Sequence, residues 1–287
     1  MVRLEKVEKH FGLMSNIYAK AEFMNPGGSI KDRAALAIID EAEKKGLLKN
    51  RRIVEATSGN MGISFAMIGA LRGYNVSIVM PDSASEEREC LIKAYGARVI
   101  RTKEGMSEAI DISEAIAKHE NSFTARQFEN TAAVNYHYQK TGYEIWRDMG
   151  GNIDFFIAGV GTGATIVGIG RYLKERTRVK VIAVEPANSP VLSGGKAGAH
   201  RIEGIGAGFI PKLYDPTLVD EVVGISDEEA IEMSRILANK EGLLAGISGG
   251  ANLAAAVKIG KYNSGNTIIP IPDRGERYFS KGVFSLD

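Results

Sequence analysis

The chain has 287 residues, of which 44% are hydrophobic and 25% charged, a composition typical of a folded globular protein. Its 36 basic and 35 acidic residues give a net charge of +1, which argues against a nucleic-acid partner because binding the phosphate backbone requires a basic surface. Glycine makes up roughly 11% of the chain against a usual value near 7%, which indicates turns where the backbone lies close to a ligand.

Cysteine usage and the N-terminal residues indicate where the protein works. The single Cys90 excludes an intrachain disulfide, and the four histidines are scattered without the spacing of metal ligands. The first residues are charged, unlike a secretory signal, and no apolar stretch reaches the roughly 18 residues of a membrane-spanning helix. We expect a cytoplasmic protein that binds neither a metal nor a membrane.

Short β-branched segments alternate with longer helical segments, which is the pattern of an α/β fold with mainly parallel sheets. Strands are predicted at Ile17–Phe23, Ile53–Ala56, Val76–Met80, Arg98–Arg101, Asp154–Ala158, Lys180–Val184 and Thr267–Ile271. Helices are predicted at Ile30–Lys45, Gly62–Arg72, Glu86–Tyr95, Met106–Lys118, Ala132–Asp148, Thr165–Arg176, Asp227–Lys240 and Asn252–Lys261. A domain boundary is expected between Asn130 and Gly151.

The first candidate site is the segment Asn25-Pro26-Gly27-Gly28-Ser29-Ile30-Lys31-Asp32-Arg33. Its proline and glycines form a turn, and Ser29 is expected to be a helix N-cap with Asp32 completing an approximate capping box. Lys31 then lies in the first helical turn, where the helix dipole disfavours the ammonium form and favours a neutral amine that can form a Schiff base. The alternative is a solvated helix start with an incidental lysine.

The second candidate is Thr57-Ser58-Gly59-Asn60-Met61-Gly62, between a predicted strand and a predicted helix. Main-chain N–H groups at such a turn form an anion pocket that suits a substrate carboxylate. An ordinary helix start, with Ser58 or Asn60 as its N-cap, is the alternative.

The third candidate is Gly159-Val160-Gly161-Thr162-Gly163-Ala164-Thr165, which fits the pattern G-x-G-x-x-A. Since the next strand ends in Glu185, the segment is compatible with a dinucleotide site. The same turn, with its two threonine hydroxyls, equally suits a single phosphate monoester. A third alternative is a turn that is rich in glycine only for close packing.

A fourth segment, Gly246-Ile247-Ser248-Gly249-Gly250-Ala251, precedes the predicted helix at Asn252–Lys261. Its Ser248 is either an N-cap or a neutral hydroxyl that points into a cavity. No Walker A sequence and no G-x-S-x-G elbow occurs in the chain.

Taken in order, these four segments, together with Gln127–Asn130 and Gly204–Phe209, resemble the motifs of the cysteine synthase (O-acetylserine sulfhydrylase) family. The resemblance runs from Val2 to Tyr278 and implies a pyridoxal-phosphate enzyme of fold type II. Its two domains would be three-layer α/β/α units: a smaller mobile one at residues 35–135 and a larger one, which binds the cofactor phosphate, at residues 1–34 and 136–287. The implied reaction is a β-replacement that forms L-cysteine from O-acetyl-L-serine and sulfide through an aminoacrylate intermediate.

The resemblance also implies residue roles, with Lys31 as the catalytic residue that holds pyridoxal 5'-phosphate. The implied cofactor-binding residues are Lys31, Asn60, Gly161, Thr162, Gly163, Ala164, Thr165 and Ser248. The implied substrate-binding residues are Thr57, Ser58, Gly59, Asn60, Met61, Gln127 and Gly206. Ser248 would face the pyridine nitrogen and, as a neutral hydroxyl, leave it unprotonated, which suits β-elimination better than transamination.

Three features depart from the family pattern. The chain starts at a point inside the family's first conserved segment, which implies that an N-terminal portion is missing. Met61 replaces a threonine, and Ala164 replaces a glycine whose substitution is harmless only at a negative φ.

The resemblance further implies a homodimer and possible docking of a serine acetyltransferase C-terminal tail. Three other activities use the same scaffold: cystathionine β-synthase, cysteine desulfhydrase and lanthionine synthase. A catalytically inactive relative that binds a partner protein, and a nicotinamide enzyme built on Gly159–Ala164 and Glu185, are the remaining alternatives.

Overall fold

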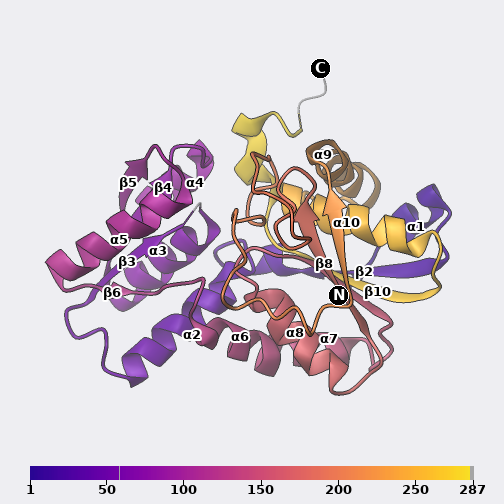
Figure 1. The fold of residues 1–287 in the computed structure, drawn as a ribbon, viewed down its shortest axis with the longest axis horizontal. Helices are drawn as coiled ribbons and strands as arrows, with labels where there is room; N and C mark the ends of the chain where they lie inside the picture. Colours follow the sequence, from indigo (N-terminus) through magenta and orange to yellow (C-terminus); the bar gives the residue numbers. More distant parts are fainter. Residues whose placement is uncertain (58, 285–287) are drawn as a thin grey trace.

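The structure, a computed structural model that describes residues 1–57 and 59–284, contains two sheets of mainly parallel strands (Figure 1). The larger has six strands in the order β1-β2-β10-β7-β8-β9. These are β1 (Val2–Arg3), β2 (Ser15–Ala21), β10 (Gly265–Ile271), β7 (Phe155–Gly159), β8 (Lys180–Pro186) and β9 (Glu221–Ile225). In the described part of the chain its strand pairs are parallel except β1 with β2.

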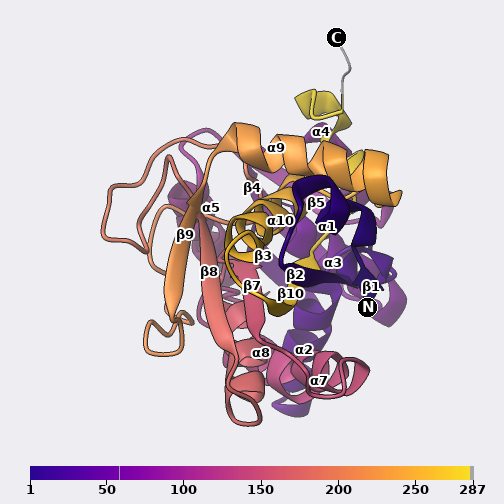
Figure 2. The same cartoon turned by 90° about the vertical axis from the view of Figure 1, so that its right-hand side faces the viewer.

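Helices cover both faces of this sheet, as the two views show (Figures 1 and 2). On one face lie α2 (Lys31–Lys44), α6 (Thr131–Tyr136), α7 (Tyr143–Asp148) and α8 (Ala164–Lys174). On the other lie α1 (Glu5–Phe11), α9 (Asp227–Ile236) and α10 (Ile247–Gly260). Successive strand residues therefore enter different cores, as Phe155 and Phe156 do, which explains the continuous apolar runs in the sequence.

The smaller sheet is a parallel one with the order β5-β4-β3-β6. Its strands are β3 (Arg52–Ala56), β4 (Asn75–Pro81), β5 (Arg98–Thr102) and β6 (Phe123–Thr124). The helices around it are α3 (Asn60–Arg72), α4 (Glu86–Ala94) and α5 (Met106–Glu120). On one face α5 packs its Ala109 against Val54 and Val79, while α3 packs into the core that continues to α2.

The predicted α/β class with parallel sheets is confirmed, and each predicted strand and helix has a counterpart. The predictions missed α1, β9 and the strands β1 and β6. Strands β1 and β6 have two residues each, too few for a periodic pattern. The single helix predicted at Ala132–Asp148 contains a π-helical turn, His137–Gly142, between α6 and α7. The last predicted helix begins five residues earlier than expected, at Ile247, because Gly246 and not Ser248 is its N-cap.

The expected capping box at the start of α2 is wrong. The Ser29 hydroxyl accepts the N–H of Lys31 at 3.2 Å instead of capping a later residue. The helix N-cap is Ile30, and the Asp32 carboxylate accepts the Gly27 N–H and the Ser64 hydroxyl, each at 2.6 Å. Asp32 thus joins the turn before Lys31 to α3 in the smaller unit. Among the described residues, no helix has the length and apolar character needed to cross a membrane.

Candidate active site

One cavity lies where the two sheets meet, at the carboxyl ends of β3, β7 and β10 and the N-termini of α2, α8 and α10. This edge is the usual ligand position in parallel α/β folds. Ten predicted site residues line the cavity: Lys31, Thr57, Asn60, Met61, Gln127, Gly161, Thr162, Gly163, Thr165 and Ser248. Gly59, Ala164 and Gly206 belong to the surrounding turns without lining the cavity, and Ser58 lies outside the described residues.

Lys31 is the first residue of α2, and its surroundings favour the neutral amine. Burial lowers the pKa of the Lys31 side chain to about 8. The nearby His137 is fully enclosed, and burial, together with the positive charges of Lys31 and Arg33, lowers its pKa to about 3. His137 is therefore neutral at physiological pH, and the lowered pKa of Lys31 increases the share of its amine in the neutral form that attacks carbonyl groups.

The turn at the start of α8 has the geometry of a phosphate cradle. Its N-cap, Gly163, has a φ of +86°, and a Cβ there would lie 2.9 Å from the main-chain nitrogen of Tyr214. A Cβ on Gly161 would lie 2.3 Å from the carbonyl oxygen of Gly204. The helix N-terminus adds N–H groups that lack intrahelical acceptors.

Ala164 is the first residue of α8 and is not among the described non-glycine residues with positive φ. Its methyl group therefore causes no backbone strain in the cradle. Glu185 does not point to a dinucleotide site, because its carboxylate accepts the Leu192 N–H at 2.8 Å and the Ser193 hydroxyl at 2.5 Å. Gly206 supports the cradle from behind by donating its N–H to the Val160 carbonyl at 3.0 Å.

The turn between β3 and α3 presents buried Thr57 and the N-terminus of α3 to the cavity. Asn60 begins that helix, and its amide nitrogen donates to Asp273 at 2.6 Å while its oxygen accepts from Arg277. The Asn60 amide carries two N–H groups, one of which makes this bond to Asp273. Met61 is buried, so its side chain closes the cavity wall without adding a hydroxyl.

Glu55 holds Gln127 at the edge of the cavity. Its carboxylate, 2% exposed in strand β3, accepts the main-chain N–H groups of Arg126 and Gln127, each at 3.0 Å. Arg126 has a φ of +49°, an unfavourable conformation that these bonds stabilise. Burial raises the pKa of Glu55 to about 7, against the opposing effect of the N–H donors.

Replacing Glu55 by glutamine is expected to lower the free energy of unfolding by about 1–3 kcal/mol, because an amide N–H group would face a main-chain N–H. The folded pKa, about 7, exceeds the ordinary 4.5, so the stability that protonation contributes is complete below pH 4.5 and lost as the pH rises through 7. In urea unfolding, the free energy of unfolding of wild type should therefore exceed that of Glu55→Gln by more at pH 5 than at pH 8. An equal advantage at both values would contradict this assignment.

At the floor of the cavity, buried Asn252 joins three elements. Its amide oxygen accepts the Gly159 N–H at 2.8 Å, and its amide nitrogen donates to the Pro270 carbonyl at 2.9 Å. Helix α10 is thereby fixed to the ends of β7 and β10, and Ser248, one turn earlier, lines the same cavity.

Sequence reasoning missed Glu55, Arg88, Asn252 and Asp273. Two of them carry a usable signal: a carboxylate within an apolar strand and an amide within an apolar helix are unfavourable unless they are hydrogen-bonded. Arg88 carries none, because it stands among glutamates in a helix with the composition of a solvated one.

The donors around this cavity fit a phosphorylated aldehyde. Lys31 supplies a neutral amine for the carbonyl carbon, and the Gly161–Thr165 turn supplies N–H groups and hydroxyls for the phosphate. The buried hydroxyl of Ser248 suits a heteroaromatic nitrogen that stays unprotonated. Among the described residues there is no cluster of side chains that could hold a metal ion.

Comparisons with known proteins agree with this chemistry. The family described as "Pyridoxal-phosphate dependent enzyme" matches residues 1–273. A cysteine synthase of Staphylococcus aureus is 44% identical over 280 residues, which cover 95% of this chain and 90% of that protein. The crystal structure of an O-ureido-L-serine synthase superposes with a TM-score of 0.95 and 40% identity, and the match covers 100% of this chain and 92% of that chain. The crystal structure of a cysteine synthase from Entamoeba histolytica gives a TM-score of 0.94 and 38% identity, and that match covers 100% of this chain and 88% of the other.

Proposed function

Because the chain belongs to the family of pyridoxal-phosphate-dependent enzymes, we propose that it is a cysteine synthase. It forms L-cysteine from O-acetyl-L-serine and sulfide by replacing the acetate on the β-carbon. The single observation that carries the proposal is that Lys31, the α8 cradle and the group Thr57, Asn60 and Met61 line one cavity. Lys31 holds the cofactor carbonyl, the α8 cradle holds the cofactor phosphate, and Thr57, Asn60 and Met61 hold the substrate carboxylate.

The residues divide the work as follows. Thr57, Asn60 and Met61 with Gln127 bind the α-carboxylate and so orient the Cα–H bond. Released from the cofactor carbonyl, the neutral Lys31 amine removes the proton from Cα and holds it. Gly161, Thr162, Gly163 and Thr165 hold the phosphate, and Ser248 faces the ring nitrogen. When bound, pyridoxal phosphate delocalises the electrons that Cα releases as acetate leaves.

The test is cysteine formation by the purified holoenzyme from O-acetyl-L-serine and sulfide, measured against serine plus homocysteine. We expect a yellow protein that absorbs near roughly 410 nm, as a lysine-bound cofactor does, and a clear preference for the first substrate pair. Preference for serine plus homocysteine would replace the proposal by a cystathionine β-synthase. Cofactor binding without turnover of either pair would indicate an inactive relative.

A second candidate is favoured by the similarity to an O-ureido-L-serine synthase. There the same amino-acid half of the reaction would end with an oxygen nucleophile in place of sulfide. A competition assay with hydroxyurea and sulfide separates the two, because the ratio of O-ureido-L-serine to L-cysteine reports the preferred nucleophile.

Covalent attachment of pyridoxal phosphate to the apoenzyme is expected to follow the titration of Lys31. Since only the neutral amine attacks, the rate should fall about tenfold per pH unit below the pKa and level off above pH 8. Stopped-flow absorbance between pH 6.5 and 10 measures this dependence. A rate that keeps rising about tenfold per pH unit up to pH 10, as the ordinary lysine value of 10.5 predicts, would contradict the desolvated environment of Lys31.

We also propose that the smaller sheet, within residues 35–135, moves as a mobile domain against residues 1–34 and 136–287. A homodimer, a cytoplasmic location and docking of a serine acetyltransferase C-terminal tail are further proposals, supported by the resemblance alone. Sedimentation analysis of the protein tests the homodimer, and the same analysis with a peptide of that tail tests the docking.

A further inference from the structure

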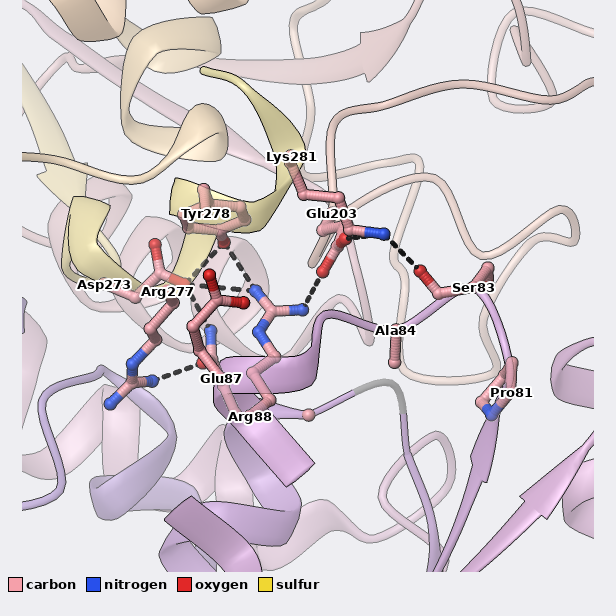
Figure 3. A network of polar contacts seen from close by, with 12 residues as sticks. Pro81, Ser83, Ala84, Glu87, Arg88, Glu203, Asp273, Arg277, Tyr278 and Lys281 are labelled. Atoms are coloured by element: carbon pink, nitrogen blue, oxygen red, sulfur yellow. Dashed lines mark hydrogen bonds and ion pairs between the residues drawn. The ribbon is translucent and has the colours of Figure 1, made fainter. Parts of the chain in front are cut away.

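Arg88 of helix α4 is fully buried between the two sheet units although it belongs to a highly charged helix. Its guanidinium ion-pairs with Glu203, donates to the Tyr278 hydroxyl at 2.5 Å and lies 3.4 Å from the Asp273 carboxylate (Figure 3). It also stacks over the Tyr278 ring, 4.9 Å from its centroid. Arg88 thus comes from the smaller unit, and all three of these partners come from the larger one.

The Asp273 carboxylate is the centre of this network. One of its oxygens accepts from Tyr278 at 2.7 Å and from the Asn60 amide at 2.6 Å, as well as facing Arg88. Asn60 is the first residue of α3 and lines the cavity. The network therefore reaches the turn that is proposed to bind the substrate carboxylate.

The stem of Arg88 makes a second contact with the same turn. It covers Gly59 so closely that a Cβ on Gly59 would lie 2.1 Å from the Arg88 Cδ. Two further contacts hold α4 and the loop before it to the C-terminal segment: the Glu87 carboxylate accepts the N–H and hydroxyl of Ser280, both at 2.7 Å, and Lys281 donates to the Ser83 carbonyl at 2.8 Å. Gly59 is thus packed against an arginine stem whose guanidinium is bound in the other unit.

We propose that Arg88 is a positioning residue that holds Gly59 and Asn60, at the start of α3, in their carboxylate-binding geometry by fastening α4 to Glu203, Asp273 and Tyr278. The inference rests on the proposed function, since it places the carboxylate at the start of α3. A planar guanidinium suits this task, because one flat group pairs with two carboxylates, donates to a hydroxyl and stacks on a ring. A lysine ammonium provides one point charge and cannot reproduce this set of contacts.

The test compares Arg88→Met and Arg88→Lys holoenzymes with wild type. Arg101→Met is the matched control, because Arg101 pairs with Glu89 of the same helix at 2.5 Å but within the smaller unit. We expect Arg88→Met to lower kcat/KM for O-acetyl-L-serine at least about tenfold while changing kcat/KM for sulfide less than about twofold. Arg88→Lys should recover part of the loss, and the control should match wild type.

Hydrogen–deuterium exchange provides a readout that does not depend on the reaction. In the Arg88→Met holoenzyme, amides of residues 57–63 and the first turn of α4 should exchange about tenfold faster, with no such change in Arg101→Met. Wild type that forms no cysteine would refute the proposed function, and the exchange data would still decide the role of Arg88. Unchanged exchange, or an equal loss of kcat/KM for both substrates with loss of cofactor, would overturn it.

If Arg88→Met does not fold, the Tyr278→Phe variant tests the same proposal. It removes the hydroxyl between Arg88 and Asp273 and keeps the ring beneath the guanidinium. We expect a loss of about threefold, again confined to kcat/KM for O-acetyl-L-serine. A change of less than about 1.5-fold in kcat/KM for both substrates, with unaltered hydrogen–deuterium exchange of residues 57–63, would count against the proposal.

Discussion

Replacing Lys31 with alanine is expected to reduce cysteine formation by at least about 10³-fold, because the variant lacks both the covalent anchor and the base that removes the Cα proton. The cradle at the start of α8 is untouched, so the variant should still bind pyridoxal phosphate without a covalent bond. Mass spectrometry after borohydride reduction measures the covalent attachment of the cofactor to lysine. Wild type should retain one cofactor on the Lys31 peptide, and Lys31→Ala should retain none.

Lys44→Ala is the control for this variant, since Lys44 stands at the exposed end of the same helix. It should keep wild-type activity and the labelled Lys31 peptide. Residual turnover in Lys31→Ala within tenfold of wild type would show that another group removes the proton.

Replacing Gly161 with alanine is expected to destabilise the protein by about 2–4 kcal/mol and to abolish cofactor retention. Its Cβ would lie 2.3 Å from the Gly204 carbonyl oxygen, so two main-chain segments must separate to admit it. That separation opens the cradle as well as the packing behind it. Urea unfolding of the apoenzyme and equilibrium dialysis with pyridoxal phosphate measure the two effects.

The matched variant is Ala164→Gly, three residues further along the same turn. It creates no clash but removes a buried methyl group and lowers helix propensity, so we expect unfolding to cost about 1–2 kcal/mol less free energy, with unchanged cofactor retention. Weaker cofactor binding in Ala164→Gly than in Gly161→Ala would contradict the geometry described for the cradle.

Local patterns were sufficient to predict where in each sheet a ligand turn lies. A turn that follows a parallel strand and precedes a helix lies at the carboxyl edge of its sheet, which applies to Thr57–Met61 and to Gly161–Thr165 separately. The two turns follow strands of different sheets, so their meeting in one site was implied by the family resemblance and not by the patterns. Lys31 was predicted in the first turn of a helix and is found there. The capping of that helix could not be predicted, because Asp32 takes donors from Gly27 and Ser64 in preference to Ser29.

Long-range contacts set the limit of prediction. Arg88 and Asp273 are 185 residues apart, and nothing in the sequence around Glu86–Glu89 distinguishes a buried arginine from a solvated one. Its burial depends on how α4 meets the C-terminal segment, which is a property of tertiary packing. The same holds for β9, whose short EVVGI sequence pairs, within the described part of the chain, only with β8.

The strand order of the larger sheet has a consequence for how the chain acquires its structure. The smaller sheet comes from one continuous stretch, β3 to β6, and can assemble while the ribosome still holds the rest. The larger sheet cannot, because β10, which follows the other strands in chain order, lies between β2 and β7. The chain must therefore have emerged at least to the end of β10 before Lys31 and the α8 cradle are fixed opposite each other, which places cofactor capture after the synthesis of both sheets.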